Sequence, residues 1–556
     1  MENEKIKIAE YLGRKLERCR ICKKSELYEF LDLGFHPPAD AILNSEEIEH
    51  PEIHFPLKVC QCENCGLTQL SYAVNKELLY GEKYKYESST TETGKNHFFK
   101  MANSICDKFG LNIDSLVIDL GSNVGVLLEG FKKRGMRILG IDPAPKIAKI
   151  ANERGIETWQ SFIEPNIASK VVAEKGKAKI IVATNVVAHI DDKEDLIQSV
   201  KMMLDEEGVF IIEAPYLVDL IDNLEYDTIY LDHLEYLSIK PLVRFFDRQG
   251  MDIFDVEKYD IHGKSIRVFV CKKGQRQISE NVQNFLNLEQ EKGIYEKETL
   301  DNFAKKVKQH KKDFVDLLRN LKKDGKKIIG ISAPAKGNTL LNYCKVNTDL
   351  IDYAVEKATI KHGHYTPSMH IPILSEKKLL EDNPDYGVIF AWNFADEIIK
   401  NNSEFAKRGG KFIIPIPQPI IMENKENLFG VKVKKIEPVH MDERGRIIDL
   451  LNEKINHVGF ITSKKDSIRG NHYHKLSIQY NYIVSGKIEI SLAKAEDPSK
   501  VEKVVLGSGE FISIQPGIIH KFKAIEDSVF LDMISESREG TGFEDDVVRV
   551  KIGELE

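Results

Sequence analysis

The feature that most constrains the fold is an apolar strand that runs directly into a glycine turn and then a helical pattern. Residues 116–125 read LVIDLGSNVG, and a second apolar strand, residues 137–142, ends in Asp142. Gly121 and Gly125 let the backbone approach a ligand closely, and an acid about 20 residues further on binds ribose hydroxyls. This order predicts a doubly wound α/β domain that binds an adenosine-containing cofactor.

The glycine turn favours S-adenosylmethionine (SAM) over a dinucleotide. Position 123 is Asn, so the G-x-G-x-x-G fingerprint is absent. SAM has no pyrophosphate and therefore does not need the tight glycine triplet. Further strand patterns lie at 180–185 and 208–215. The residues predicted to hold SAM are Asp119, Gly121, Asn123, Gly125, Asp142, Asn185 and His189.

Cysteines cluster near the start of the chain. Of eight in total, five fall between positions 19 and 65. Cys19 with Cys22, and Cys62 with Cys65, form two C-x2-C pairs, which suit a tetrahedral zinc ion better than the odd Cys60 does. Four protein ligands leave no open position, so the pattern predicts a structural zinc site, with unrelated free thiols as the alternative.

The hydrophobic pattern divides the chain into five segments and predicts a multidomain fold, α/β followed by all-β. A polar connector near 423–430 separates alternating strand and helix patterns from a region of strands alone, which predicts an all-β barrel or sandwich. The predicted segments are a zinc-binding domain (10–84), a Rossmann-like SAM domain (85–275), a connecting helix (276–325), a second α/β domain (326–422) and an all-β domain (431–556).

Charge and hydropathy exclude several classes of protein. Lys and Arg number 79 and Asp and Glu 87, a net charge of −8, whereas nucleic-acid-binding domains are usually basic. No run of about 18 apolar residues is present, and the first residues lack an apolar signal region. We therefore expect a cytoplasmic protein that binds neither nucleic acid nor membrane.

Several ordered motifs carry a family resemblance over about residues 15–420. Together with the two cysteine pairs, they resemble the SAM-dependent sugar C-methyltransferases, which act at C3 of nucleotide-linked 4-keto-6-deoxy sugars. The resemblance implies a zinc-binding domain, a Rossmann-like SAM domain and a C-terminal α/β domain that helps to hold the nucleotide sugar. The motifs lie at residues 31–40, 226–236, 261–270, 332–343, 365–373 and 391–397.

The same resemblance assigns roles around the sugar. A C4 ketone acidifies the C3 hydrogen, a general base removes it, and the carbanion is held as an enolate. By resemblance His233 is the base, and Asp232, where the family usually has Glu, orients it or takes part in proton transfer. Tyr230 belongs to the same motif, and Tyr86 lies where a family tyrosine faces the sugar.

Four more residues are predicted to bind the substrate. Residues 332–338 follow a strand and precede a helix, which indicates a phosphate-binding loop, although a structural turn is the alternative. Lys336 and Asn338 are candidates for the diphosphate or the sugar. His262 and Arg267 come from the motif at 261–270.

The β-rich tail carries a second constellation. His472 and His474 form an H-x-H pair, which places both rings on one face of a strand, and Gln479 and His520 follow. The pattern resembles a cupin. It allows a metal site with Gln in place of Glu, or proton transfer without metal. The sequence from Arg469 onward resembles cupins that epimerise or ketoisomerise nucleotide-linked 4-keto sugars.

These patterns predict a bifunctional enzyme that makes a branched deoxysugar. The cupin is expected to epimerise C5, or C3 and C5, with His472 as base, His474, His520 and Arg469 lining the pocket, and Tyr480 or Tyr482 as acid. For the cupin, the alternatives are a 3,4-ketoisomerase and a domain that only binds metal or dimerises. For the methyltransferase, the alternative is an enzyme that methylates oxygen or nitrogen of a small molecule. The expected substrate carries dTDP, with GDP as the alternative, and we expect a homodimer through the cupin.

Overall fold

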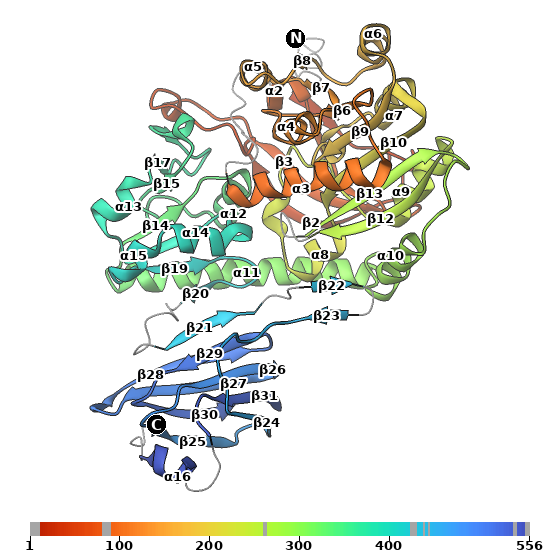
Figure 1. Ribbon diagram of the computed structural model, residues 1–556. Coiled ribbons are helices and arrows are strands. Elements are labelled where there is room, and N and C mark those ends of the chain that lie inside the picture. The colour runs from red at the N-terminus through yellow and green to blue at the C-terminus, as the bar shows by residue number, and fades with distance from the viewer. Residues whose placement is uncertain are drawn as a thin grey trace. The chain divides into compact units, whose positions relative to one another are not determined.

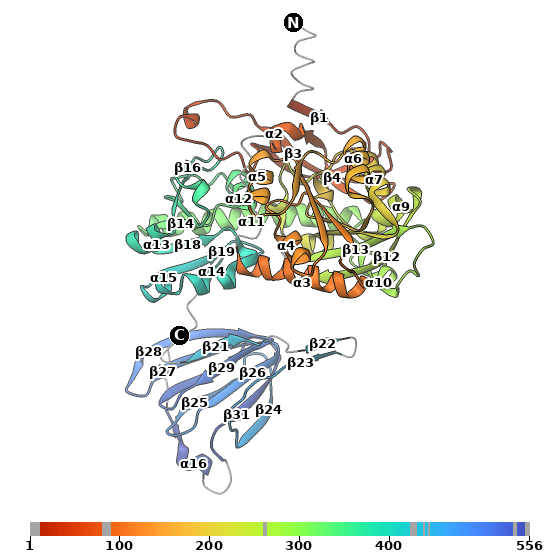
Figure 2. The ribbon, with the colours of Figure 1, turned by 45° about the horizontal axis from the view of Figure 1, so that its top comes forward.

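The computed structural model describes residues 12–80, 91–259, 264–422, 431–436, 440–442, 445–537 and 542–550. The chain folds as two units, residues 1–422 and 423–556, called here the N-terminal and C-terminal units (Figures 1 and 2). None of the helices in the described ranges combines the length and the apolar composition that a bilayer crossing requires.

The cysteine pairs flank a small antiparallel sheet in the order β11-β4-β3-β2. Its edge strand β11 comes from a segment far along the chain and pairs with β4, while β1 and β5 form a separate antiparallel pair. The bounds are β1 (Gly13–Lys15), β2 (Leu27–His36), β3 (Phe55–Cys62), β4 (Thr68–Leu70), β5 (Tyr72–Val74) and β11 (Glu235–Tyr236). The residues just before β11 are therefore tied to the cysteine-bearing sheet.

The predicted doubly wound domain is present as a seven-stranded sheet, β12-β13-β10-β9-β6-β7-β8. Its central strand β6 is buried at every position, as a parallel strand covered on both faces should be. Strand β13 runs antiparallel to β10 and β12. The strands are β6 (Leu116–Leu120), β7 (Arg137–Asp142), β8 (Thr158–Gln160), β9 (Ala178–Thr184), β10 (Leu204–Pro215), β12 (Met251–Tyr259) and β13 (Ser265–Lys272).

Helices flank this sheet. They include α2 (Lys76–Tyr80), α3 (Glu92–Phe109), α4 (Val126–Lys133), α5 (Pro145–Glu153), α6 (Pro165–Lys175), α7 (Lys193–Met203), α8 (Leu217–Asp222) and α9 (Ile239–Arg248). Helix α4 begins at Gly125 and packs closely on α3, because Gly130 leaves room for Phe99 and Ala102.

The single connecting helix predicted over 276–325 is two helices. Helix α10 (Glu280–Glu291) ends before Gly293, and α11 (Lys297–Lys323) follows. Gly293 has φ +58°, a left-handed conformation that ends a helix and that glycine adopts without strain. Helix α11 contacts β2, α12 and β14, and in Figure 1 it runs beneath the elements of both α/β sheets.

The second α/β domain is also a seven-stranded sheet, in the order β16-β17-β15-β14-β18-β19-β20. Its strands are β14 (Ile328–Ile331), β15 (Ala354–Glu356), β16 (His364–Tyr365), β17 (Pro372–Ser375), β18 (Tyr386–Ile389), β19 (Lys411–Ile414) and β20 (Ile420–Met422). Its helices are α12 (Ala335–Cys344), α13 (Lys377–Asp382), α14 (Ala395–Asn401) and α15 (Ser403–Lys407).

The C-terminal unit is all-β, as predicted, with two five-stranded antiparallel sheets, β21-β29-β26-β31-β24 and β28-β27-β30-β25-β32. Ile483, Ile490 and Phe522 belong to its apolar core. The strands are β21 (Lys432–Lys435), β24 (His457–Ser463), β25 (Ile468–His474), β26 (Gln479–Ser485), β27 (Lys487–Lys494), β28 (Asp497–Gly507), β29 (Glu510–Ile514), β30 (Ile518–Ala524), β31 (Ser528–Ile534) and β32 (Val547–Arg549), with a hairpin β22 (His440–Asp442) and β23 (Gly445–Ile447) and a short helix α16 (Gly542–Asp546).

Candidate functional site

A cavity of about 700 Å³ lies within the N-terminal unit. Its walls come from three parts of the sequence: the cysteine-bearing region, the carboxyl ends of β6, β7 and β9, and the loops of the second α/β domain. The carboxyl edge of parallel strands is the usual ligand-binding edge of an open α/β sheet. The cavity therefore brings together motifs that the sequence predicted separately.

The predicted SAM residues meet at one end of this cavity. Asp142 accepts hydrogen bonds from the backbone N–H groups of Asn123 (2.9 Å) and Ala144 (3.0 Å). Gly121 has φ +68°, and a Cβ there would lie 2.3 Å from the Val186 side chain. Gly125 also has a positive φ and begins α4. The turn thus needs glycine for both its conformation and its close packing.

Polar atoms around this end fit a polar ligand. Cavity-lining atoms that are buried without a hydrogen-bond partner in the described residues include Asp119 Oδ1, Ser122 Oγ, Asn185 Oδ1, His189 Nε2 and Asp232 Oδ2. Buried polar groups in native proteins are nearly always paired, so these groups indicate a ligand that supplies partners. Acceptor oxygens beside a glycine turn fit the hydroxyl and ammonium groups of SAM.

Three ring side chains meet at the sugar-binding end predicted from the sequence. The His233 ring lies 3.9 Å from Tyr230 and 4.9 Å from His189, between ring centroids. His233 Nδ1 is 2.7 Å from the carbonyl oxygen of Thr228, so Nδ1 carries the hydrogen and Nε2 the lone pair. His189 also stacks on Tyr80, and burial holds its pKa well below the ordinary value.

Asp232 lines the same end of the cavity but does not orient His233 through Nδ1, which is bonded to Thr228. Burial, and secondarily the charge of Asp40, raise the pKa of Asp232 to about 8. Asp232 is therefore a neutral carboxylic acid at pH 7 and can donate a hydrogen bond.

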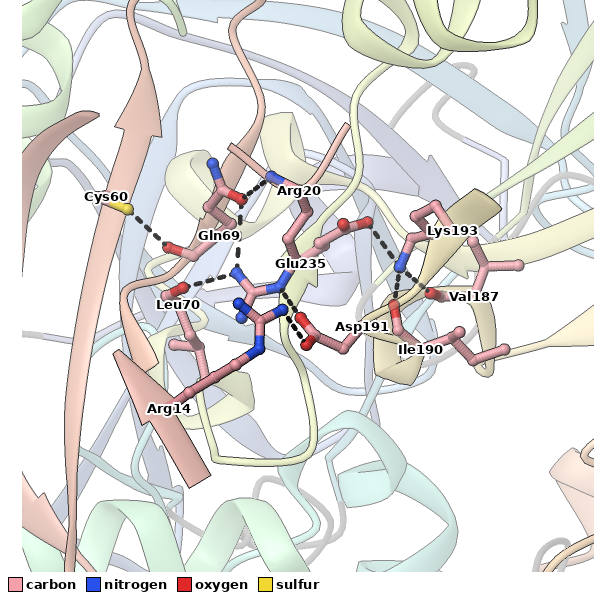
Figure 3. A network of polar contacts seen from close by, with 10 residues as sticks. All are labelled: Arg14, Arg20, Cys60, Gln69, Leu70, Val187, Ile190, Asp191, Lys193 and Glu235. Atoms are coloured by element: carbon pink, nitrogen blue, oxygen red, sulfur yellow. Dashed lines mark hydrogen bonds and ion pairs between the residues drawn. The ribbon is translucent and has the colours of Figure 1, made fainter. Parts of the chain in front are cut away.

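A buried polar network joins the first cysteine pair to the segment that carries His189 (Figure 3). Arg20, between Cys19 and Cys22, donates to Asp191 at 2.8 Å and to the Leu70 carbonyl at 2.7 Å. Its side chain is 1% exposed.

Lys193 continues this network. It donates to the carbonyl groups of Val187 and Ile190, which flank His189, and forms an ion pair with Glu235 at 3.2 Å. Glu235 follows His233 by two residues. Both histidine-bearing segments are thus held against the cysteine-bearing sheet.

The predicted phosphate loop contributes a buried lysine to the cavity. Lys336 donates to Asn393 Oδ1 at 3.0 Å and lies 4.8 Å above the Trp392 ring. Burial lowers the pKa of Lys336, and the neighbouring acids Asp227 and Glu225 oppose this shift. Asn338 points elsewhere: its amide donates to the carbonyl of Ala39, and it does not line the cavity.

Arg267 does not line the cavity either. Its Nε and Nη2 atoms lie 2.9 and 2.7 Å from Glu213 Oε2, and both side chains are 1% exposed. The other oxygen of Glu213 bonds His97 Nε2 at 2.6 Å, and His97 does line the cavity. Two predicted residues, Tyr86 and His262, lie outside the described residues.

The four predicted zinc ligands converge. Sγ atoms of Cys19 and Cys65 are 3.6 Å apart and those of Cys22 and Cys62 are 3.4 Å apart, and all four sulfurs lie within 4.8 Å of one another. Tetrahedral zinc at about 2.3 Å from each sulfur fits this spacing. Cys60 instead contacts the Gln69 carbonyl.

The predicted histidines of the C-terminal unit also converge, with ring nitrogens of His472, His474 and His520 within 4.8 Å of one another. His520 Nδ1 lies 3.0 Å from the Ile518 carbonyl, and its Nε2 lies 3.2 Å from His472 Nε2. Burial and the neighbouring His472 lower the pKa of His520 to about 3. His520 is therefore neutral with its hydrogen on Nδ1, and His472 donates from Nε2.

His474 faces an acceptor at each nitrogen. Nδ1 lies 2.8 Å from Asp546 Oδ2, and Nε2 lies 3.1 Å from Gln479 Oε1. The amide nitrogen of Gln479 donates to Asp532, which fixes the orientation of the amide. Both ring nitrogens of His474 are thus engaged by neighbouring side chains.

Two predicted residues of the C-terminal unit point away from these histidines. Gln479 and Asn481 face Asp532, so the alternating Tyr480 and Tyr482 lie on the other face of β26, packed with Phe511 and Met533. The Tyr480 hydroxyl donates to Glu453 at 2.6 Å. Tyr480 is thus not placed to protonate a sugar held at the histidines. Arg469 bonds the Thr462 carbonyl and Ser463.

Sequence reasoning missed several cavity residues. Tyr80 and His97 lie in none of the named motifs, and His97 and its partner Glu213 are 116 positions apart. Asp40 is the last residue of the motif at 31–40, so its place in that motif was the available signal.

Comparison with known families identifies several domains along the chain. Four family profiles match: a zinc binding domain (residues 19–80), a methyltransferase domain (100–256), a C-methyltransferase C-terminal domain (260–417) and a polysaccharide biosynthesis C-terminal domain (440–538).

The chain is 33% identical over 416 residues to the C-methyltransferase NovU from Streptomyces niveus, covering 75% of this chain and 99% of that protein.

Several solved structures resemble the C-terminal part of the chain. A double-mutant form of the 3,4-ketoisomerase QdtA from Thermoanaerobacterium thermosaccharolyticum is 26% identical over 22% of this chain and 88% of its own, with a TM-score of 0.19. A dTDP-4-dehydrorhamnose 3,5-epimerase from Sulfolobus tokodaii is 20% identical over 22% of this chain and 78% of its own, with a TM-score of 0.19.

Proposed function

Because the chain belongs to the C-methyltransferase family that includes NovU, we propose that its N-terminal unit methylates a ring carbon beside the ketone of a nucleotide-linked 4-keto-6-deoxy sugar. One observation carries the proposal: a single cavity contains both the glycine turn with its acids and the His233 cluster. A methyl donor and an acidic C–H group can therefore meet in one enclosed space.

The cofactor that fits is SAM, which supplies an electrophilic methyl group when bound. Asp142 would hold the ribose hydroxyls, and the Gly121 turn would admit the adenosine side of the molecule. The unpaired Asp119, Ser122 and Asn185 atoms would accept or donate to its polar groups. The four cysteines would hold a structural zinc ion, since they leave no open coordination position.

His233 is the proposed base. Its Nδ1–H is committed to the Thr228 carbonyl, so Nε2 receives the proton from the sugar carbon. The electron pair of the broken C–H bond moves into the enolate, whose carbon then takes the methyl group. The C4 ketone acidifies C3 and C5 equally, and C3 is the position that the sequence resemblance predicts. The adjacent His189 is neutral because burial lowers its pKa, so it adds no positive charge beside His233.

Asp232 is the proposed partner of the enolate oxygen. As a neutral acid it donates a hydrogen bond to the oxygen on which negative charge develops, whereas an ionised carboxylate would repel that charge. Lys336, which also lines the cavity, is a candidate for binding the diphosphate.

Methyl transfer in D2O tests this assignment. We would incubate the enzyme with 13C-methyl SAM and either dTDP- or GDP-linked 4-keto-6-deoxyglucose, and read proton and carbon NMR. A new methyl group on a ring carbon next to the ketone is expected. Methylation on oxygen or nitrogen, or full activity on a sugar without a ketone, would overturn the enolate route.

For the C-terminal unit we propose proton transfer on a 4-keto sugar, with His472 as the base. His472 donates from Nε2 to His520, so its lone pair lies on Nδ1. The protonated His472 would then return the proton to the sugar, so base and acid are the same residue.

This one-sided arrangement favours 3,4-ketoisomerisation over epimerisation. Inversion needs an acid on the far side of the ring from the base, and Tyr480 and Tyr482 lie on the other face of β26. A ketone shift needs only proton relocation along one face. With SAM omitted, NMR in D2O should show a 3-keto product that disappears in His472→Ala. Deuterium at C5 with the 4-ketone retained would instead establish epimerisation.

A further inference from the structure

A buried chain of three side chains crosses the methyltransferase sheet and ends at the cavity. Glu213 of β10 and Arg267 of β13 are directly opposed in the antiparallel register, and the Glu213 carboxylate also bonds His97 of α3. The mechanism proposed above uses none of the three. Glu213 and Arg267 are almost fully buried, so this arrangement belongs to the interior of the domain and is not an incidental surface contact.

The hydrogen bond to Glu213 fixes the tautomer of His97. Burial acts to raise the pKa of Glu213, but the hydrogen bond from His97 and the charge of Arg267 outweigh it, and the pKa lies below its usual value. Glu213 is therefore an anion already balanced by Arg267. His97 donates Nε2–H to it at 2.6 Å, which leaves the lone pair of the ring on Nδ1.

The His97 ring contributes to the cavity wall, and its side chain is 14% exposed. Within the described ranges, Glu213 is its one polar partner; Phe98 and Tyr259 contact the ring only as aromatic neighbours. The edge that carries Nε2 is turned to the buried Glu213. The ring therefore presents an acceptor atom, with its orientation locked, to whatever the cavity binds.

The sheet order indicates which ligand group comes near. From the ribose-binding Asp142 on β7, the order runs through β6 and β9 to β10, which carries Glu213. The backbone N–H of Asn185, just past β9, donates to the Glu213 carbonyl at 2.7 Å. A SAM whose ribose lies at Asp142 and whose tail follows the carboxyl edge of the sheet brings its amino-acid end toward β10.

That end of SAM carries an ammonium group, which only donates hydrogen bonds, and a carboxylate, which only accepts them. A lone pair on Nδ1 pairs with the first and repels the second. We propose that His97 accepts a hydrogen bond from the α-ammonium group of SAM, with Glu213 and Arg267 as positioning residues that fix its tautomer. This inference rests on the proposed use of SAM.

Two ligands separate the tail contact from the rest of the site. S-adenosylhomocysteine has the amino-acid tail, and 5′-methylthioadenosine shares the adenosine but lacks the tail. We would measure the binding of each to the full chain by titration calorimetry. The variants are His97→Leu, which removes the acceptor, His97→Asn, which keeps an acceptor near the Nδ1 position, and Lys95→Ala, an exposed control on the same helix.

We expect His97→Leu to weaken S-adenosylhomocysteine binding by about 10–100-fold, the range for a hydrogen bond to a charged group, and to leave 5′-methylthioadenosine binding nearly unchanged. His97→Asn should fall between it and the wild type, and Lys95→Ala should match the wild type.

Equal losses for both ligands in His97→Leu would overturn the proposal, since the ring would then only shape the pocket. So would unchanged S-adenosylhomocysteine binding with a raised KM for the sugar, which would place His97 against the other substrate. A wild-type protein that binds neither ligand would instead refute the use of SAM itself, which is a separate failure.

Discussion

The two histidine sites of this chain are built in opposite ways. Around His233, the cavity wall leaves polar atoms of Asp119, Asn185 and Asp232 without partners among the described residues. Around His474, nearly every polar atom is satisfied internally: Asp546 accepts from His474 and Ser477, and Asp532 accepts from Gln479 and Asn481.

The difference shows what each site requires from its ligand. Unpaired buried groups carry a free-energy cost that a bound cofactor and sugar would relieve, so the first site is completed by binding. A saturated network instead fixes proton positions before any ligand arrives. Five experiments test this contrast.

Removing the base should abolish one activity and spare the other. His233→Ala is expected to lower kcat for methyl transfer by about 10²–10⁴-fold, the usual contribution of a general base. Transfer of radiolabelled methyl to the sugar measures it, with His54→Ala, an exposed histidine of the same unit, as control. A fall of less than tenfold would show that another group takes the proton.

Breaking the buried ion pair should destabilise the N-terminal unit. Glu213→Gln leaves the Arg267 cation unpaired in the interior, and we expect a loss of about 3–5 kcal/mol in the free energy of unfolding. Both tryptophans, Trp159 and Trp392, belong to this unit, so their fluorescence in urea reports it. The double variant Glu213→Leu/Arg267→Leu should recover part of the loss; an equal or larger loss would contradict the argument.

Breaking the saturated network should be felt in the C-terminal unit alone. Asp546→Asn removes the charge that accepts from His474, Ser477 and the Leu476 N–H, and we expect about 1.5–3 kcal/mol less protection of peptides near 474–481 in hydrogen exchange. Methyl transfer should be unchanged. Unaltered exchange would mean that Asp546 does not hold this site together.

The pH dependence tests the neutral state of Asp232. Because its pKa is raised to about 8, the carboxyl group is protonated below that pH and loses its proton above it. The rate of methyl transfer should therefore fall as pH rises through 8, approaching about tenfold per pH unit. Asp232→Asn keeps a donor that does not titrate, so this limb should vanish. Its persistence in the variant would assign it to another group.

The smallest expected effect is the response to a cofactor product. S-adenosylhomocysteine should slow hydrogen exchange at residues 116–125 and 184–191, since binding supplies partners to unpaired groups there. The histidine strands of the C-terminal unit, already satisfied, should exchange at an unchanged rate. Protection of β25 and β26 by this ligand would erase the contrast between the sites.

Features defined by local spacing could be predicted from the sequence. The strand and glycine turn at 116–125, the two cysteine pairs and the H-x-H pair all lie within a few residues, and the structure brings each together. The helix break at Gly293 is also local. It could not be predicted, because a glycine inside a strong helical pattern can also continue the helix, and its left-handed conformation is seen only in the structure.

Long-range pairings could not be predicted in the same way. Arg267 was assigned to the substrate because it lies in a motif, yet its partner Glu213 lies on another strand. The direction of Tyr480 was within reach: strand residues alternate between faces, so placing Gln479 with the histidines already turns Tyr480 away.

The network in Figure 3 has a consequence for recombining parts of such enzymes. Arg20 buries its charge against Asp191, across the junction between the cysteine-bearing segment and the methyltransferase segment. A chimera that exchanged residues 12–80 alone would leave Asp191 facing an unmatched partner, and strand β11 an unmatched neighbour. For protein engineering, the two segments should be exchanged together, although separate family profiles match them.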